Sequence, residues 1–359
     1  MLLVSDVLLQ LFASYGRNLY TSTMRQIWMT NNKKAGYLHL QEAAEPVPKN
    51  GEVRIRVEAI GVNYADILHG ILINTPDKPY VPGFEVSGVV DLVSQGVGDL
   101  KEGDAVFAFS HYGGYSDVIC VPHKQVFRRF DWMSAEDAVT LPMNYLGAYV
   151  MLVVMGSLKA NEKVFIHTAA SGLGIAALDI CSIIGAETFG TAVTGIHDFL
   201  YKRGLDHPID HQRIDYEREV MIQTQDTGVQ IVLDTFGGIH WPKNYRLLAP
   251  AGRLIHGGMQ DLAIQTRRDW LAALRGLVML PFYTPLKLMR DNKGIIGVDL
   301  LALWQKPELM RTWMAQLTAW YDEALFRPKI DKVFKLDEVA AAHQYLQKRH
   351  NLGKVVLKP

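Results

Sequence analysis

From Met24 to about Tyr149, the chain carries short apolar or alternating runs separated by turn residues. The runs EVRIRVEAI, VSGVVDLV, DAVFAF and YSDVICV have the length and the two-residue period of strands. Glycines such as Gly51 and Gly103 lie between them, as expected of turns. The pattern predicts a β-rich domain with the architecture of a barrel or a sandwich.

From about Val150, apolar runs alternate with segments of helical period. We expect strands at VFIHTA, ETFGTAV, HPID, VQIVLDTFGG and GRLIHGGM, with helices near residues 175–184, 196–203, 216–224 and 241–248. This alternation is typical of a doubly wound parallel sheet, the Rossmann type of α/β fold. Near the end, one helical face carries apolar residues that we expect in the core: Leu309, Trp313, Leu317, Trp320 and Tyr321.

The last run, KVVLKP, reads as a strand that returns to the first domain. The α/β domain is therefore expected as an insertion in the β-rich one. We place the β-rich domain at residues 24–149 and 305–359, the α/β domain at 150–304, and an extension at 1–23.

Residues 163–192 predict a strand, a glycine-bearing turn, a buried helix and a second strand in one unit. Free N–H groups at the start of such a helix, next to small side chains, allow a pyrophosphate to approach closely. In a G-x-G-x-x-G alignment that ends at Gly174, the first two glycines are replaced by Ala169 and Ser171. A dinucleotide site is the favoured interpretation, and a purely structural turn is the alternative.

The amino-acid composition argues against several classes of protein. The 37 basic and 37 acidic residues of this 359-residue chain balance, which gives no overall field for nucleic acid. Its two cysteines, Cys120 and Cys181, form no CxxC pair, which excludes a disulfide framework and a cysteine-based zinc module. A reducing, cytoplasmic compartment is expected.

Residues 1–23 carry apolar positions at helical spacing, and Met24 is a second candidate start. The alternatives are an accessory helix packed on the body, an upstream start of translation, and a surface or membrane anchor. Residues 271–289 are apolar but contain Pro281 and Pro285 together with charges, so we expect a core or interface segment there.

Seven motifs together resemble the zinc-free quinone oxidoreductase branch of the medium-chain dehydrogenase/reductase superfamily. They are GVNYAD (61–66), VPGFEVSGVV (81–90), KEGDAVFAF (101–109), LPMNYLGAYVML (141–152), HTAASGLGIAA (167–177), VLDTFGG (232–238) and NLGKVVL (351–357). Within that branch, DHPIDHQRIDY and NKGIIGVDL are most similar to the vesicle amine transport protein homologues. The resemblance implies a chaperonin-10-like β-rich catalytic domain, an inserted Rossmann domain, NADPH in the cleft between them, and a homodimer.

The branches of this superfamily differ in whether they bind zinc. Where the alcohol dehydrogenases carry a cysteine and a histidine, this chain has Asn63 and Phe84, and only Glu85 of that pattern is present. A four-coordinate zinc needs three or four soft or imidazole ligands. We therefore expect no metal.

Without zinc, the acceptor itself must spread the charge that hydride transfer creates. A quinone or another activated α,β-unsaturated carbonyl does so, and then needs hydrogen-bond donors and a proton. The resemblance places Asn63 and Tyr64 where the catalytic domain faces the nicotinamide, and Asn144 is a further candidate. The alternative for Asn63 and Tyr64 is local structure, with backbone hydrogen bonds and packing.

The second strand ends in Ala192, Val193 and Thr194, where NAD-binding chains commonly have a carboxylate that binds the ribose 2′-hydroxyl. Its absence favours NADPH over NADH, with Lys202 and His211 as candidate phosphate partners. The full set of expected cofactor contacts is Asn63, Ala170, Ser171, Gly172, Leu173, Gly174, Thr191, Lys202, His211, Phe236, Gly257, Met259 and Asn351.

Two alternatives to a quinone or enone reductase stay open. The similarity of LPMNYLGAY to enoyl reductase domains suggests an enoyl-thioester reductase. The resemblance to the vesicle proteins suggests a membrane or organelle interaction protein that binds NADPH with little catalysis.

Overall fold

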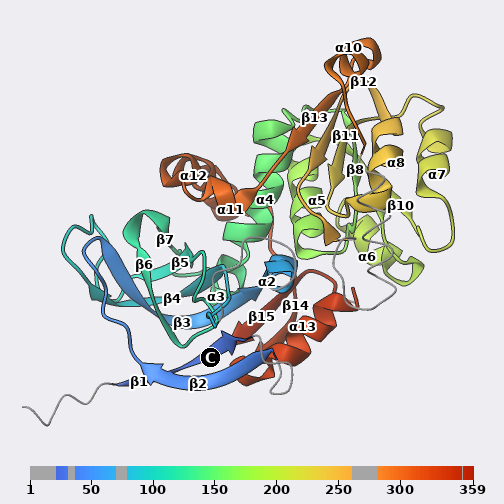
Figure 1. The fold of residues 1–359 in the computed structure, drawn as a ribbon. Coiled ribbons are helices and arrows are strands. Elements are labelled where there is room, and N and C mark those ends of the chain that lie inside the picture. The colour runs from blue at the N-terminus through green and yellow to red at the C-terminus, as the bar shows by residue number, and fades with distance from the viewer. Residues whose placement is uncertain (1–21, 31–36, 70–78, 261–280, 350) are drawn as a thin grey trace, which may run out of the picture.

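The computed structural model describes residues 22–30, 37–69, 79–260, 281–349 and 351–359, which form two lobes (Figure 1). The two ends of the described chain build a β-rich lobe, and the middle builds an α/β lobe. The expected extension at residues 1–23 lies almost entirely outside the described residues.

The β-rich lobe contains a seven-stranded sheet in the order β14-β15-β3-β4-β5-β7, with β6 also paired to β3. Along β3, alternate residues such as Val53, Ile55 and Val57 are buried, as the sequence period requires. A separate two-stranded sheet holds β1 and β2. The strands are β1 (Thr23–Met29), β2 (Leu38–Ala44), β3 (Glu52–Val62), β4 (Glu85–Val93), β5 (Ala105–Phe109), β6 (Val118–Pro122), β7 (Val126–Arg128), β14 (Ile330–Lys335) and β15 (Lys354–Lys358).

The α/β lobe is built on a six-stranded parallel sheet in the order β10-β9-β8-β11-β12-β13. The chain order reverses between β8 and β11, and ligands of such sheets bind at the carboxyl ends of the strands beside this point. The strands are β8 (Lys163–Ile166), β9 (Glu187–Thr191), β10 (His207–Ile209), β11 (Val229–Asp234), β12 (Leu248–His256) and β13 (Gly294–Gly297).

The last strand of the chain, β15, pairs antiparallel with β3. The α/β lobe is thus inserted into the β-rich one, and the predicted fold class is confirmed. The helices are α2 (Tyr64–His69), α3 (Ala135–Ala138), α4 (Leu146–Tyr149), α5 (Gly172–Ile184), α6 (His197–Lys202), α7 (Tyr216–Gln223), α8 (Trp241–Arg246), α10 (Pro285–Asp291), α11 (Leu300–Leu303), α12 (Pro307–Asp322) and α13 (Val339–Gln347).

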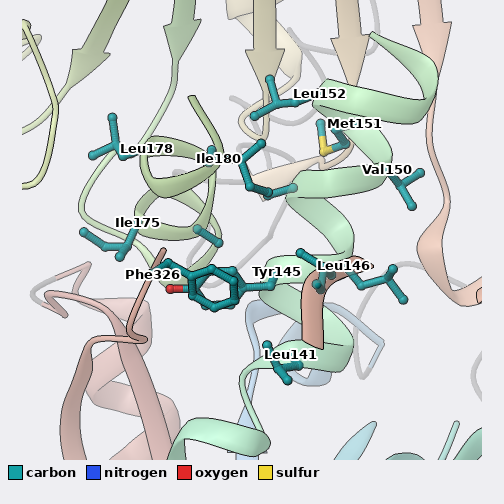
Figure 2. Close-up of a cluster of buried hydrophobic side chains, with 14 of the residues drawn as sticks. Leu141, Tyr145, Leu146, Val150, Met151, Leu152, Ile175, Leu178, Ile180 and Phe326 are labelled. Carbon is teal, nitrogen blue, oxygen red and sulfur yellow. The ribbon is translucent and has the colours of Figure 1, made fainter. Parts of the chain in front are cut away.

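A helical segment joins the lobes and packs on α5. It contains two π-helical turns, Leu141–Tyr145 and Val150–Met155, on either side of α4. Figure 2 shows its apolar side chains facing those of α5, with the Tyr145 ring stacked on Phe326 at 4.2 Å between centroids. Because π-helical turns often occur at functional sites, this segment is a candidate contributor to the cleft.

The expected core stripe near the end of the chain is partly wrong. In α12 the fully buried residues are Met310, Met314, Leu317 and Tyr321, whereas Leu309 is 48% exposed. The helix turns its flexible methionines inward, and Trp313 and Trp320 pack at the edge of the core.

One stretch of the described residues, Ala135–Met155, has the length and apolar composition of a membrane-crossing helix. It is the segment that joins the lobes, and 67% of its most apolar window is buried inside the molecule. Core helices have the same composition when they are buried on most sides.

Candidate functional site

The glycine turn connects β8 to α5 at the carboxyl edge of the parallel sheet. Ser171 is the N-cap of α5, and its Oγ accepts the N–H of Gly174 at 3.0 Å. A Cβ added to Gly174 would lie 2.3 Å from the Thr168 carbonyl oxygen, so the turn has no space for a side chain there. The N-terminus of a thirteen-residue helix is thereby held against the end of the sheet, with a small residue, Ala170, before it.

The C-terminal segment of the β-rich lobe crosses this turn. Gly353 forms a bridge with Ser171, and its N–H donates to the Ala170 carbonyl at 2.8 Å. The Asn351 side chain donates to the Gly353 carbonyl at 3.0 Å. The structure therefore brings Ala170, Ser171 and Asn351 together, as the sequence predicts.

Asn144 reaches the same turn from the π-helical segment. A Cβ added to Gly172 would lie 2.5 Å from Asn144 Oδ1, and this buried oxygen has no hydrogen-bond partner within the described chain. Leu173 packs against the core beside it. The missing side chain at Gly172 thus accommodates an unsatisfied amide, which is an available acceptor at the cleft.

Asn63 lies in a buried polar cluster immediately before α2. Its Nδ2 donates to Glu85 Oε1 at 2.8 Å, and its Oδ1 accepts from Lys354 Nζ at 2.7 Å. Lys354 Nζ also bonds Glu85 Oε1 at 2.5 Å, and the N–H of Met143 donates to Glu85 Oε2 at 2.9 Å. Tyr64, at the start of α2, packs against the core of the β-rich lobe. This position agrees with the alternative in which Tyr64 serves in packing.

Asp66 braces Asn63 from the other side. Its Oδ2 accepts the backbone N–H of Asn63 at 2.7 Å, and burial raises its pKa to about 7. The Tyr115 hydroxyl hydrogen-bonds His343 at 2.9 Å and also interacts with Asp66. Burial lowers the pKa of His343 to about 4, so this imidazole is neutral near pH 7.

The end of the second strand differs from the sequence expectation in one respect. Thr191 lies there as expected, and its Oγ1 accepts the N–H of Thr168 at 2.9 Å. However, Asp210, which follows β10, accepts from the N–H and the hydroxyl of Thr194 at 3.0 and 2.6 Å. A carboxylate is therefore present near this strand end, although Thr194 and Arg213 engage its oxygens.

Phe236 is the centre of an aromatic and basic group at the carboxyl edge of the sheet. The rings of His167, His211 and His240 lie 4.9, 5.9 and 5.0 Å from it. The Arg349 guanidinium, from the segment between α13 and β15, lies 4.9 Å above the ring. Burial lowers the pKa of His167 to about 4, so this imidazole is neutral near pH 7, and Arg349 brings a permanent positive charge to the group.

Two further predicted residues, Gly257 and Met259, follow β12 at the same edge. The N–H of Gly257 donates to the Asp234 carbonyl at 2.9 Å, and Met259 lies beside Gly237. Lys202 is not brought to this edge. It is the last, exposed residue of α6, a helix that runs away from the carboxyl ends of the strands.

Several residues of the site were not assigned from the sequence, among them Lys354, Arg349 and Asp210. Lys354 stands in the quoted run NLGKVVL, where a lysine within an apolar strand is the available signal. Nothing local marks Arg349 or Asp210, because each acquires its neighbours only through the tertiary fold.

Within the described ranges, no three His, Cys, Asp or Glu side chains are arranged to hold a metal ion. The polar groups of the site include the amides of Asn63 and Asn144, the paired Lys354 ammonium and Glu85 carboxylate, the Arg349 guanidinium and the backbone N–H groups of the glycine turn. Such a set suits hydrogen-bond recognition of a carbonyl and of phosphates.

Family comparisons cover both lobes. Residues 49–131 match the alcohol dehydrogenase GroES-like domain, and residues 203–357 match the zinc-binding dehydrogenase family.

Several proteins are similar over most of their length. The Mus musculus synaptic vesicle membrane protein VAT-1 homolog is 36% identical over 325 residues, which is 90% of this chain and 80% of that protein. The human quinone oxidoreductase is 27% identical over 84% of this chain and 87% of its own.

Among solved structures, the human VAT-1 homolog-like protein has a TM-score of 0.81 and 32% identity, covering 94% of this chain and 98% of its own. The Escherichia coli quinone oxidoreductase complexed with NADPH has a TM-score of 0.82 at 21% identity, covering 94% and 100%, and so shares the fold.

Proposed function

The chain belongs to the medium-chain dehydrogenase/reductase superfamily, and we propose that it is a zinc-independent reductase of quinones or other activated α,β-unsaturated carbonyls that uses NADPH. The observation that carries this proposal is the buried cluster of Asn63, Glu85 and Lys354. The superfamily gives the general oxidoreductase chemistry, and we infer the class of substrate from the cluster.

The cluster does not fit a zinc ion. Zinc takes thiolate, imidazole or carboxylate ligands, and Glu85 is the one side chain of these types here. Its carboxylate already bonds the Lys354 ammonium, which a metal ion would have to displace. The neighbouring position, Phe84, supplies no ligand atom.

The glycine turn supports a dinucleotide as the cofactor. Gly172 and Gly174 leave no room for side chains, and the start of α5 faces the cleft beside Ala170 and Asn351. Arg349 and His211 beside Phe236 supply basic groups suited to a 2′-phosphate, which favours NADPH over NADH. The NADPH-bound quinone oxidoreductase structure of the same fold supports this choice.

When bound, NADPH supplies a hydride, and with one proton it reduces the conjugated acceptor to the saturated carbonyl or hydroquinone. The chain's own residues position the acceptor and stabilise the charge that develops on its carbonyl oxygen. Asn63 is the donor that we assign to that oxygen, because Nδ2 has a second hydrogen with no partner among the described residues. Asn144 supplies an acceptor beside the glycine turn.

The experiment is a titration of the purified chain with NADPH and NADH, followed by a panel of quinones, enones and enoyl thioesters. We expect tighter binding of NADPH and NADPH oxidation that requires a quinone or an enone. NADPH binding without turnover of any acceptor would contradict the proposed activity, and turnover of thioesters alone would move the substrate class to acyl chains.

We also propose that the chain acts in the cytoplasm as a homodimer. Two free cysteines agree with a reducing compartment. Among the described residues, β13 is the last strand of the parallel sheet, and a second copy could extend the sheet at this edge. Light scattering on the purified chain tests the dimer.

The names of the relatives support a second candidate role at a membrane surface. The 36% identical relative is called a synaptic vesicle membrane protein, and residues 1–23 carry apolar positions at helical spacing. Flotation with liposomes, with and without residues 1–23, tests peripheral membrane contact. Binding that depends on those residues, in a chain without reductase activity, would favour this role.

A further inference from the structure

The cluster of Asn63, Glu85 and Lys354 holds a buried positive charge whose function the fold alone does not explain. Glu85 is fully buried, and Lys354 and Asn63 are 3% and 7% exposed. Burying an ion pair costs desolvation free energy that its attraction often fails to recover, so apolar residues would stabilise the fold at least as well.

The surrounding chain is shaped around this ion pair. A Cβ added to Gly61 would lie 2.2 Å from Glu85 Oε1, so the missing side chain at Gly61 creates the space for the carboxylate. Met143 donates its N–H to the second carboxylate oxygen, and Asp66 accepts the backbone N–H of Asn63. Both the side chain and the backbone of Asn63 are thus fixed.

Lys354 and Glu85 together determine which way the Asn63 amide points. An ammonium group only donates hydrogen bonds, and a carboxylate only accepts them. The amide oxygen must therefore face Lys354 at 2.7 Å, and the NH₂ group must face Glu85 at 2.8 Å. The opposite orientation would place a donor against a donor and an acceptor against an acceptor.

The cluster is also connected to the glycine turn on two sides. Gly353, the residue before Lys354, donates its N–H to Ala170. On the other side, Asn144 follows Met143 and lies against the position of a side chain at Gly172. The cluster therefore lies directly beside the glycine turn, which is the expected cofactor site.

We propose that Lys354 is a positioning residue that acts through Asn63: its buried charge fixes the amide so that one N–H faces the carbonyl oxygen of the substrate. This inference rests on the proposed function. Lys354 does not itself contact the substrate.

The test compares steady-state kinetics and NADPH binding of Lys354→Met and of Lys354→Met combined with Glu85→Gln. The double variant leaves no unpaired buried charge and carries the test if the single variant fails to fold. We expect kcat for the acceptor to fall by about 10-fold to 100-fold in both, with the dissociation constant of NADPH unchanged. Lys358→Met is the matched control, because Lys358 lies on the same strand but pairs with Glu136 at the surface.

A second comparison separates positioning from general support of the fold. Asn63→Ala should lower kcat to the same extent, and adding Lys354→Met to it should cause no further loss, since one amide carries both effects. Additive losses, or equal losses in kcat, NADPH affinity and melting temperature, would show a structural role and overturn the inference. A folded Lys354→Met, Glu85→Gln variant with wild-type kcat would also overturn the inference, but it would leave the proposed function intact. A wild-type chain that reduces no acceptor would overturn both the inference and the proposed function.

Discussion

At the scale of single residues, Asp66 shows how burial changes the protonation of one carboxyl group. It is 1% exposed, and burial raises its pKa to about 7, although the Asn63 N–H and the nearby Lys354 oppose the shift. In the unfolded chain this carboxyl group has its ordinary pKa of 3.8. Between pH 3.8 and about 7, the folded chain therefore binds more protons than the unfolded chain. The Asp66 contribution to stability is therefore present at low pH and is lost as the pH rises through about 7.

Replacing Asp66 by asparagine should remove this dependence while an oxygen remains to accept the Asn63 N–H. Relative to the wild type, the free energy of unfolding of Asp66→Asn should rise by about 1.4 kcal/mol per pH unit within that window. Urea unfolding of both proteins at about pH 5, 6 and 7 measures it. The buried His167 and His343 act in the opposite direction in both proteins and cancel from the difference. A difference that does not change with pH would contradict the assignment.

At the scale of elements, the start of α5 depends on the absence of a side chain at Gly174. Alanine ordinarily stabilises a helix relative to glycine. At this position, however, its Cβ would lie 2.3 Å from the Thr168 carbonyl oxygen and 2.7 Å from that of Ala169. Steric conflict with backbone atoms outweighs helix propensity, because the turn cannot move without shifting β8 or α5.

Gly174→Ala should therefore lower the free energy of unfolding by about 1–3 kcal/mol and weaken NADPH binding. Thermal unfolding and calorimetric titration measure the two effects. Gly98→Ala is the matched control, because a Cβ there meets nothing within 4 Å and Gly98 lies between β4 and β5 of the β-rich lobe. If Gly174→Ala matched this control in stability and NADPH affinity, the turn would not be the constrained cofactor site described above.

Most elements were predictable because their periodicity and caps are local. The strand, the glycine-bearing turn and the helix predicted within residues 163–192 all appear in the structure. Ser171 is the N-cap of that helix, and Gly185 ends it in a left-handed C-cap. In α12, Leu317 and Tyr321 are buried as predicted, but the first turns bury Met310 and Met314 in place of Leu309 and Trp313. Leu309 and Met310 are both apolar, and only tertiary packing decides between them.

At the scale of the whole molecule, the cleft is assembled from segments far apart in the sequence. Asn63 and Lys354 are 291 residues apart and share a hydrogen bond, and Arg349 reaches Phe236 from the other lobe. No local pattern encodes such contacts, so Lys354 and Arg349 were not predicted as site residues. The glycine turn was predicted from its local pattern, and Asn63 from the resemblance to the superfamily. The resemblance to a superfamily supplied the general location of the site, and the three-dimensional contacts supplied these partners.

Arg349 should set the preference between the two nicotinamide cofactors, because a guanidinium suits a 2′-phosphate that NADH lacks. Arg349→Met should weaken NADPH binding by about 10-fold and leave NADH binding nearly unchanged, as expected for one charge-assisted contact. Fluorescence titration with both cofactors measures the ratio. Arg311→Met is the control, since Arg311 lies over Phe127 in a similar way at 5.4 Å. Equal weakening of both cofactors would show that Arg349 only supports the fold.

We propose that this chain reduces a conjugated carbonyl with NADPH and without a metal. The most direct measurement is the rate of NADPH oxidation by the wild-type chain with a quinone or an enone, before and after exhaustive treatment with a zinc chelator. The buried Lys354, Glu85 and Asn63 cluster predicts that acceptor-dependent turnover is present and that chelation leaves it unchanged. Turnover that disappears on chelation and returns with zinc, or no turnover with any acceptor, would contradict it.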